Sequence, residues 1–364
     1  MKLLYVLPRM SGEGGVQRVI AFKLNYLVTH FNFDIHLLCH DQTPAFYPLD
    51  SRIQMHYLTL EGNRWSYFQK YRRGIKNTVA TVRPEVVVVC DGFKGYFLPY
   101  FKLDVPLIFE VHGSYYNRIY PSRGWGWKNI KYFFELLIKR RLAARFNCLV
   151  VLSKEAKEEW KLPSTVVIPN PNWIIPLPRN PQKVALMVAR HSYEKGIDRM
   201  LPIWAQFIQN HPDWILRIFG SGSKINSHSL AHQLGILDSV HFEDPTSSIT
   251  EVYAQSGMFL MTSRFEGLPM ALMEAMACGV PSVAYDCPVG PRALLLTKEH
   301  GYLIPDGNSE AFLSAMNEIA LDFPTAPHAK TAIASVARFQ PEIVMKQWVV
   351  LLESIRSNAN DNKV

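Results

Sequence analysis

Short, almost wholly apolar runs alternate with longer amphipathic stretches along nearly the whole chain, and this alternation constrains the fold more than any other feature. Runs such as residues 2–7 (KLLYVL) and 85–90 (EVVVVC) are apolar at most positions, which is typical of strands covered on both faces. Between such runs, stretches like residues 16–30 carry apolar residues at helical spacing. The alternation predicts βαβ units, parallel sheets and an α/β fold. In the first half we expect strands at residues 2–7, 34–39, 85–90, 107–112 and 148–153.

A proline-rich segment interrupts the alternation. Residues 168–183 contain five prolines, which disfavour both helices and central strands. The pattern then resumes, and 364 residues are too many for one ordinary core. We therefore predict two doubly wound, Rossmann-like domains, residues 1–168 and 184–340, joined by a linker at 169–183. The expected strands of the second half are residues 184–189, 215–220, 240–242, 258–261, 281–285 and 301–304.

The last residues, 341–364, follow a different pattern. Residues 341–356 are amphipathic at helical spacing, and residues 357–364 (SNANDNKV) are polar. We expect a final helix that packs back on the first domain, followed by a frayed tail. Ligands of open parallel sheets bind beyond the carboxyl ends of the strands, so we expect a site in a cleft where the two domains face each other.

Two glutamates in the segment 263–284 (SRFEGLPMALMEAMACGVPSVA) suggest the chemistry of that site. Glu266 precedes a Gly267-Leu268-Pro269 turn, and the following residues favour a helix that starts at the proline. The free N–H groups of a helix start attract an anion, and Glu274 lies a turn and a half further on. Carboxylates beside an anion site suit the paired hydroxyls of sugars, so the pattern suggests a sugar nucleotide. The alternatives are a solvated loop acid for Glu266 and a buried, paired structural acid for Glu274.

Cationic and glycine residues elsewhere in the second domain complete this hypothesis. Arg190 and Lys195 follow the predicted strand 184–189 and precede a helix, where they could neutralise a diphosphate. The turn FGSGS, residues 219–223, would let a nucleotide approach closely at Gly220. Each cation taken alone is better explained as a solvated surface group.

The first domain contributes a glycine-rich turn and a histidine. Gly14 and Gly15 lie between the first strand and the first helix, but the turn matches neither a dinucleotide nor a P-loop motif. His112 follows a predicted strand and precedes a glycine, which places it where it could contact a ligand hydroxyl or a developing charge. A histidine satisfied within the core is the alternative.

Cysteine and acidic patterns give no indication of a metal. The five cysteines have neither paired nor zinc-type spacing, and no Asp-x-Asp motif occurs. We therefore expect a metal-independent protein of a reducing compartment. The N-terminal residues predict a strand and not a signal peptide, and no apolar run is long enough to span a membrane.

Together these segments resemble the family 4 retaining glycosyltransferases, which have the GT-B fold of two Rossmann-like domains. The resemblance rests on the two glutamates in EGLPMALME, with ARHSYEKG, FGSGS, VHG and GEGGVQR in the expected order, and covers nearly the whole chain. It implies that Glu266 contacts the donor sugar, Glu274 the ribose, and Arg190 and Lys195 the diphosphate. The remaining implied contacts are the amides near Gly267 and Leu268 with the distal phosphate, Gly14 and Gly15 with the donor or acceptor phosphate region, and His112 with the transferred hexose.

The resemblance also implies an activity. It suggests a retaining hexosyltransferase without a cofactor, whose donor is a nucleotide sugar with UDP as the nucleotide, and whose acceptor is a glycan or a polyprenyl-diphosphate-linked saccharide in bacterial surface polysaccharide biosynthesis. The segment AYDCPVGPRALL, residues 284–295, is similar to a subgroup that transfers N-acetylgalactosamine or related sugars.

Charge is unevenly distributed. Residues 1–170 hold 24 Lys and Arg against 13 Asp and Glu, whereas the rest of the chain holds 15 against 18. The excess lies in residues 64–83 and in residues 117–147, where Trp125 and Trp127 precede a basic amphipathic stretch. We expect a cytoplasmic protein whose first domain binds the inner, anionic face of the cell membrane. The alternatives are an ordinary helix that covers the sheet, a nucleic-acid-binding protein, which no recognition motif supports, and a non-catalytic protein that binds nucleotide sugars.

Overall fold

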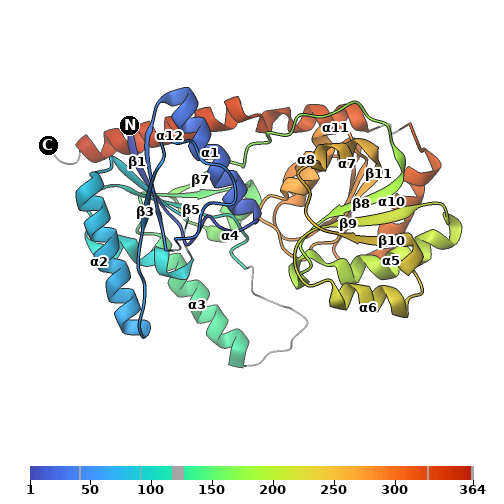
Figure 1. The fold of residues 1–364 in the computed structure, drawn as a ribbon, viewed down its shortest axis with the longest axis horizontal. Helices are drawn as coiled ribbons and strands as arrows, with labels where there is room; N and C mark the ends of the chain where they lie inside the picture. The colour runs from blue at the N-terminus through green and yellow to red at the C-terminus, as the bar shows by residue number, and fades with distance from the viewer. Residues whose placement is uncertain (41, 91, 117–126, 326–327, 362–364) are drawn as a thin grey trace. The chain divides into compact units, whose positions relative to one another are not determined.

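The computed structural model describes residues 1–40, 42–90, 92–116, 127–325 and 328–361, without the side chains of residues 64, 127–131, 360 and 361. The chain forms two compact units (Figure 1). Unit 1 comprises Met1–Pro171 and Glu342–Val364, and unit 2 comprises Asn172–Pro341. Each unit is built on one parallel sheet with helices between its strands, so the predicted α/β fold with two Rossmann-like domains is confirmed.

Within the described residues, the sheet of unit 1 has seven strands: β1 (Lys2–Val6), β2 (Asp34–Cys39), β3 (Gln54–Tyr57), β4 (Val86–Val89), β5 (Leu107–Glu110), β6 (Cys148–Val151) and β7 (Thr165–Val167). Their order is β3-β2-β1-β4-β5-β6-β7, and every neighbouring pair is parallel. In the centre, Leu4 of β1 lies opposite His36 of β2 and Val87 of β4. These inner strands are mostly apolar because both faces of the sheet are covered.

The helices of unit 1 are α1 (Gly15–Phe31), α2 (Arg64–Val82), the 3₁₀ helix η1 (Phe93–Phe101), α3 (Trp127–Ala143), α4 (Lys154–Trp160) and α12 (Pro341–Asp361). The last helix, α12, lies beside α1 (Figure 1). Trp348 and Leu352 of α12 share one apolar core with Leu24 of α1 and Leu3 of β1. The final helix of the chain therefore completes the core of its first unit.

Unit 2 contains, in the part that the structure describes, the strands β8 (Gln182–Val188), β9 (Ile215–Phe219), β10 (Val240–Glu243), β11 (Ser256–Met261), β12 (Ser282–Asp286) and β13 (Tyr302–Pro305). They form a parallel sheet in the order β10-β9-β8-β11-β12-β13. The helices are η2 (Tyr193–Lys195), α5 (Ile197–Asn210), α6 (Ile225–Gln233), η3 (Leu237–Ser239), α7 (Ile249–Gln255), α8 (Met270–Ala277), α9 (Pro291–Leu294), η4 (Lys298–His300), α10 (Ser309–Leu321), α11 (Ala329–Val336) and η5 (Ala337–Phe339).

The structure corrects three details of the sequence analysis. Strands β3 and β7 were not predicted, because β3 (QMHY) is neither apolar nor buried and β7 has only three residues. The prediction of a frayed tail is wrong for residues 357–361, which form the last part of α12. Neither proline nor glycine occurs there to interrupt the hydrogen bonds of the helix. Residues 362–364 lie outside the described part. Finally, α8 begins one residue after Pro269, which caps the helix and does not open it.

The polypeptide enters and leaves unit 2 at neighbouring points. The backbone N–H of Asn172 donates a hydrogen bond of 2.7 Å to the carbonyl oxygen of Phe339, two residues before α12 begins. Over the residues described, no helix combines the length and apolar character needed to cross a membrane.

Candidate functional site

The strand order of unit 2 reverses between β8 and β11, which lie side by side at its centre. Doubly wound folds bind their ligands beyond the carboxyl ends of the strands at such a reversal. The loop after β8 carries Arg190 and Lys195, and the loop after β11 carries Glu266, Gly267 and Leu268. These five predicted residues therefore lie at the same edge of one sheet.

Lys195 and Glu266 are in direct contact. The Nζ of Lys195 lies 2.7 Å from Oε1 and 2.9 Å from Oε2 of Glu266. The two side chains remain 22 % and 8 % exposed, so solvent still reaches the pair. A lysine ammonium has three N–H donors, and one bound to a carboxylate can also donate to a phosphate oxygen.

Arg264, which was not predicted as a site residue, fixes the turn that presents Lys195. Its guanidinium donates to both carboxylate oxygens of Asp198 at 2.8 and 2.6 Å, and to the carbonyl oxygen of Tyr193 at 2.8 Å. Burial tends to raise the pKa of Asp198, but the Arg264 hydrogen bonds outweigh it and hold that pKa below its ordinary value. The bidentate geometry gives this contact orientation as well as energy. The only sequence signal for Arg264 is its position two residues before Glu266.

Two glycines allow the loops to approach each other closely. Gly196 has a φ of +67°, and a Cβ there would lie 2.1 Å from the carbonyl oxygen of Thr262. Gly290, with a φ of +107°, packs beneath the Glu266 loop, and a Cβ there would lie 2.8 Å from Cδ of Pro269. Any larger residue would therefore displace the loop that carries Glu266. Gly290 was not predicted as a site residue.

Glu274 lies within α8, and only 2 % of this residue is exposed. The hydroxyl of Tyr253 donates to its Oε2 at 3.1 Å and also contacts the carbonyl oxygen of Ala271 at 3.1 Å. Among the described residues, no side chain caps the N-terminus of α8. The helix thus keeps backbone donors at the end adjoining Gly267 and Leu268, with a buried carboxylate further along.

Arg190 and Gly220 lie at the neighbouring loops. Arg190 Nη2 contacts Oε1 of Glu194 at 2.8 Å, and its side chain is 58 % exposed. A Cβ at Gly220 would lie 2.0 Å from the carbonyl oxygen of Ala189, so glycine lets the loops after β8 and β9 touch. In this arrangement Arg190 pairs with Glu194, while Lys195 pairs with Glu266.

Unit 1 has its own reversal of strand order, between β1 and β4. A cavity of about 290 Å³ lies near the carboxyl ends of β4 and β5, and Val16 at the start of α1 reaches it. Gly14 is the N-cap of α1 and Gly15 its first residue, so the two predicted glycines directly precede Val16 but do not themselves line the cavity. Its lining residues are Val16, Cys90, Gly92, Phe93, Tyr96, Phe109, Glu110, Val111, His112, Gly113, Ser114, Tyr132, Glu135, Leu136 and Lys139.

His112 lies in a buried group of charged residues at this cavity. Its Nε2 is 3.1 Å from Oε1 of Glu110, and the same oxygen is 2.5 Å from Nζ of Lys23. The Lys23 and Glu110 side chains are each 1 % exposed. Neither was predicted as a site residue, although Lys23 stands out in the sequence as a lysine among the apolar residues of α1.

The charges set the protonation of this group. Burial raises the pKa of Glu110, but Lys23 and His112 outweigh it and lower the pKa to about 2. Burial lowers the pKa of His112, whereas its interactions with Cys90 and Glu110 raise it, with a balance at about 10. At neutral pH the group therefore holds a carboxylate and an imidazolium side by side.

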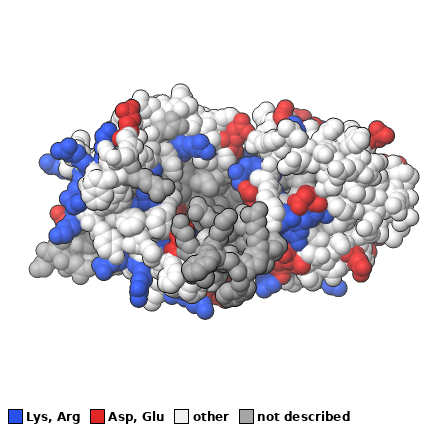
Figure 2. Space-filling view, turned by 90° about the horizontal axis from the view of Figure 1, so that it is seen from below, with Lys and Arg blue, Asp and Glu red and all other residues white. Residues whose placement is uncertain are grey.

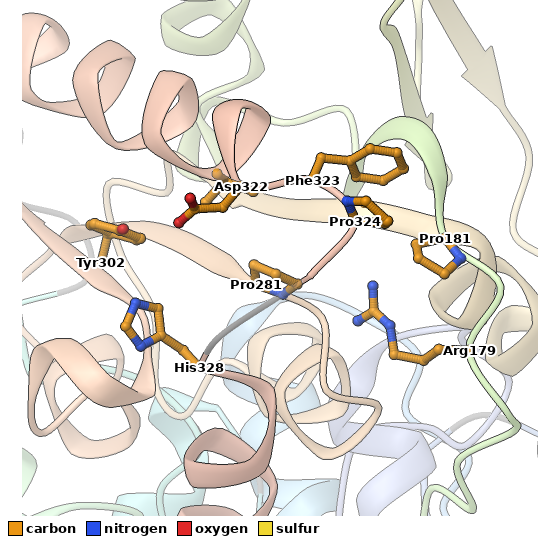
Figure 3. Close-up of a pocket in the computed structure, with 10 residues that line it drawn as sticks. Arg179, Pro181, Pro281, Tyr302, Asp322, Phe323, Pro324 and His328 are labelled. Atoms are coloured by element: carbon orange, nitrogen blue, oxygen red, sulfur yellow. The ribbon is translucent and has the colours of Figure 1, made fainter.

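A second cavity lies at the opposite edge of the unit 2 sheet (Figure 3). Pro181, Pro281 and Tyr302 stand at the amino ends of strands, together with Arg179 and His328. The cavity has a volume of about 10 Å³, enough for a water molecule and far too little for a nucleotide.

Basic and apolar side chains are exposed on two helices of unit 1. On α2, Lys70, Arg72, Arg73 and Lys76 are exposed, and Trp65 at its start is 72 % exposed. On the face of the molecule that Figure 2 displays, Lys and Arg gather on unit 1, with few Asp or Glu among them. The second basic cluster is described in part: Trp125 lies outside the described residues, as does the side chain of Trp127.

On α3 several apolar residues face solvent. The exposed fractions of Phe133, Phe134, Leu137 and Ile138 lie between 40 % and 59 %. The inner side of α3 carries buried Leu136, Leu142 and Ala143. Lys139 also lies there, with its Nζ 4.9 Å from the centre of the Trp160 ring. This helix therefore covers its unit and also leaves apolar side chains exposed.

Comparison with known proteins identifies the family of this chain, its relatives and solved structures that share its fold. Residues 173–359 match the family described as glycosyl transferases group 1, and residues 13–171 match glycosyltransferase family 4. The chain is 27 % identical over 364 residues to the amylovoran biosynthesis glycosyltransferase AmsD of Erwinia amylovora, covering 95 % of this chain and 98 % of the relative.

Two solved structures share the fold. Sucrose-phosphate synthase of Thermosynechococcus elongatus superimposes with a TM-score of 0.82 at 16 % identity, over 98 % of this chain and all of the other. HepE of Anabaena in complex with UDP superimposes with a TM-score of 0.75 at 17 % identity, over 97 % of this chain and all of the other. The predicted GT-B fold is thus confirmed.

Proposed function

This chain belongs to the glycosyl transferases group 1 and is a glycosyltransferase, and on that premise we propose that it moves a hexose or an N-acetylhexosamine from UDP to a glycan or a lipid-linked saccharide. The observation that carries the proposal is the Lys195–Glu266 contact beside α8, with Glu274 buried within that helix. It joins a cation, backbone donors and two carboxylates, which are the groups that a sugar diphosphate needs. AmsD and the UDP complex of HepE support the choice of nucleotide and pathway, which is bacterial surface polysaccharide biosynthesis.

The proposed reaction is a transfer with retention of the anomeric configuration. The bond from C1 of the donor sugar to the diphosphate oxygen breaks, and an acceptor hydroxyl oxygen bonds to C1 on the same face. The acceptor proton passes to the departing phosphate oxygen. Protein groups orient the reactants and stabilise the charge that develops on the diphosphate.

Each site residue receives a role in this scheme. Lys195 and Arg190 leave their carboxylate partners for the diphosphate, and the amides at Gly267 and Leu268 bind the distal phosphate. At an effective dielectric constant near 20, one unit charge at about 4 Å contributes about 4 kcal/mol to such stabilisation. Glu266, released from Lys195, accepts hydrogen bonds from the donor sugar.

The remaining groups bind the two ends of the donor and the acceptor. Glu274 accepts hydrogen bonds from the ribose, and Gly220 admits the nucleotide. His112 contacts the transferred hexose, and the backbone at Gly14 and Gly15 lies in the phosphate region. The reaction in this proposal needs neither a metal nor a cofactor.

Donor binding and product stereochemistry test the proposal. The purified protein is screened with UDP- and GDP-sugars for a rise in melting temperature, and we expect UDP-sugars to raise it most. Incubation with that donor and a polyprenyl-diphosphate-linked N-acetylhexosamine should give UDP and a product with the donor's anomeric configuration, read from its ¹H NMR coupling constant. Inverted product would contradict retention, and stabilisation by GDP-sugars alone would contradict the nucleotide.

We also propose that α3 and α2 bind an anionic bilayer, which places the enzyme at the inner face of the cell membrane. Exposed Phe133, Phe134, Leu137 and Ile138 would enter the interface, while Arg72 and Arg73 would face lipid phosphates. The chemistry suits a lipid-linked acceptor.

Flotation with vesicles of phosphatidylglycerol and phosphatidylcholine tests this surface. We expect Phe133→Ser/Phe134→Ser to lower vesicle binding about tenfold, and Ile333→Ser, an exposed apolar residue of unit 2, to leave it unchanged. Retention of single-stranded oligonucleotides at physiological salt, without vesicle binding, would favour a nucleic-acid partner and overturn the membrane proposal.

A further inference from the structure

The buried ion pair of Lys23 and Glu110 is a costly feature that stability does not explain. Lysine and glutamate are almost never fully buried unless paired, and a buried pair often stabilises a protein no better than apolar residues of the same volume would. Here both side chains are 1 % exposed, with Nζ of Lys23 2.5 Å from Oε1 of Glu110. A group that gains little stability from its burial is a candidate for a functional role.

The pair contacts one of the proposed site residues. Oε1 of Glu110 also lies 3.1 Å from Nε2 of His112, and both residues line the cavity of unit 1. Nε2 of His112 is thus committed to Glu110, whereas Nδ1 has Cys90 and no carboxylate as its partner within the described part of the chain. A protonated ring has an N–H at both nitrogens, so Nδ1 is the donor that a bound molecule can use.

The elements around the pair hold it in place. Lys23 comes from α1 and Glu110 from β5, and the Trp348 ring of α12 covers the ammonium at 3.6 Å. A cation over a tryptophan ring is further stabilised by the ring quadrupole, most strongly where water is excluded. Three elements far apart in sequence therefore fix the carboxylate that touches His112.

The charged and titratable groups facing His112 come from several elements. They are Glu110 of β5, Cys90 after β4, Lys23 of α1, Tyr5 of β1, and Glu135 and Lys139 of α3. Glu110 is the one carboxylate among them at ion-pair distance from the ring within the described residues.

We propose that Glu110 is a positioning residue for His112: held by Lys23, its carboxylate orients the ring and keeps it a hydrogen-bond donor to an oxygen of the bound sugar. The inference rests on the proposed function, in which His112 contacts the transferred hexose. It adds two residues, Glu110 and Lys23, that act through His112 and do not touch the substrate.

The first test reads the His112 ring directly and needs no activity. Long-range ¹H–¹⁵N NMR of histidine-labelled protein, with His112→Asn to assign the signal, follows the ring from pH 6 to 10. We expect the wild-type ring to remain an imidazolium at pH 8, because Glu110 and Cys90 raise its pKa to about 10. In Glu110→Gln the titration should move down by at least one pH unit, and an unmoved titration would overturn the proposal.

The second test is a double-mutant cycle on UDP release from UDP-glucose, UDP-galactose and their N-acetylhexosamine counterparts. We expect Glu110→Gln to lower kcat at least tenfold with KM changed less than threefold, and to have no further effect in the His112→Asn background. An equal loss in both backgrounds would overturn the positioning role. Glu85→Gln, which breaks another glutamate pair of unit 1 with Arg356, is the control that should leave kcat and the ring titration unchanged.

Two further outcomes are separable. If the wild-type protein releases UDP from none of these donors, the proposed function fails, while the ring titration still decides the role of Glu110. If Glu110→Gln does not fold by circular dichroism, Glu110→Asp replaces it. This variant keeps the negative charge, but its shorter side chain holds the carboxylate further from His112. The shift of the ring titration and the loss of kcat should both be smaller and in the same direction, and their absence would count against the proposal.

Discussion

Each unit places a lysine–glutamate pair near the carboxyl ends of its central strands, yet the two pairs differ in their access to solvent. Lys23 and Glu110 in unit 1 are both 1 % exposed, whereas Lys195 and Glu266 in unit 2 are 22 % and 8 % exposed. Solvent reaches Lys195, whereas the Trp348 ring covers the ammonium of Lys23. Under the proposed function, a lysine–glutamate pair is thus a fixed support in unit 1 and an exchangeable partner in unit 2.

Removal of each lysine should affect the stability of the two units very differently. Lys23→Met leaves the Glu110 charge buried and unpaired, so we expect unit 1 to lose about 3–5 kcal/mol of unfolding free energy. Lys195→Met should cost unit 2 at most about 1 kcal/mol, because its pair is partly exposed. Hydrogen exchange of peptides from β5 and β11 in urea measures the units separately.

Replacing both members of the buried pair is the control for this prediction. Lys23→Met/Glu110→Met should recover most of the lost stability, since no unpaired charge remains. Equal losses for Lys23→Met and Lys195→Met would show that the two pairs do not differ as described.

The affinity for UDP, unlike the unfolding free energy, should depend on the partly exposed pair of unit 2. Lys195→Met should weaken UDP binding by about 1.5–3 kcal/mol, roughly 10- to 150-fold, because a charged hydrogen bond to the diphosphate is lost. Isothermal titration calorimetry with UDP measures this change. Lys183, at the start of β8 in the same unit, pairs with Asp213. Lys183→Met should therefore leave the affinity for UDP unchanged. An unaltered affinity of Lys195→Met would contradict the role of the exchangeable pair.

A third substitution sharpens the account of unit 2. Glu274→Ala should weaken UDP binding by about 1 to 3 kcal/mol through loss of the ribose acceptor. Tyr253→Phe keeps the carboxylate and removes only its hydroxyl partner, so its effect should be below about 1 kcal/mol. If Tyr253→Phe and Glu274→Ala weaken binding equally, Glu274 acts through its packing and not as a ligand.

The last prediction is a pH dependence of unit 1. The pKa of His112 is about 10 against an ordinary 6.5, so its stabilisation is complete below about pH 6.5 and is lost as pH rises through 10. The pKa of Glu110 is about 2 against 4.5, so its contribution is present above pH 4.5 and is lost as pH falls through 2. Protection of β5 amides, corrected for intrinsic exchange, should fall between pH 7 and 10 in the wild type and stay constant in His112→Asn.

The local pattern of the sequence predicted most of the fold, because apolar runs separated by helical stretches leave few alternatives to two parallel sheets. It also directed Lys195 and Glu266 to one sheet edge, since both follow central strands. Their direct contact depends on Gly196, whose missing Cβ lets the loops meet, and this could not be deduced from spacing. Lys23, Glu110 and Arg264 were missed as site residues because their partners come from remote segments: a buried lysine looks, in sequence, like one polar residue on a helix.

The return of α12 to unit 1 also has a consequence for biosynthesis. A ribosome delivers residues 1–171 first, yet Trp348, which shields Lys23, emerges only after all of unit 2. The shielding of this ion pair therefore depends on a segment that is synthesised after unit 2. We expect deletion of α12 to expose a buried ion pair in the unit that is made first.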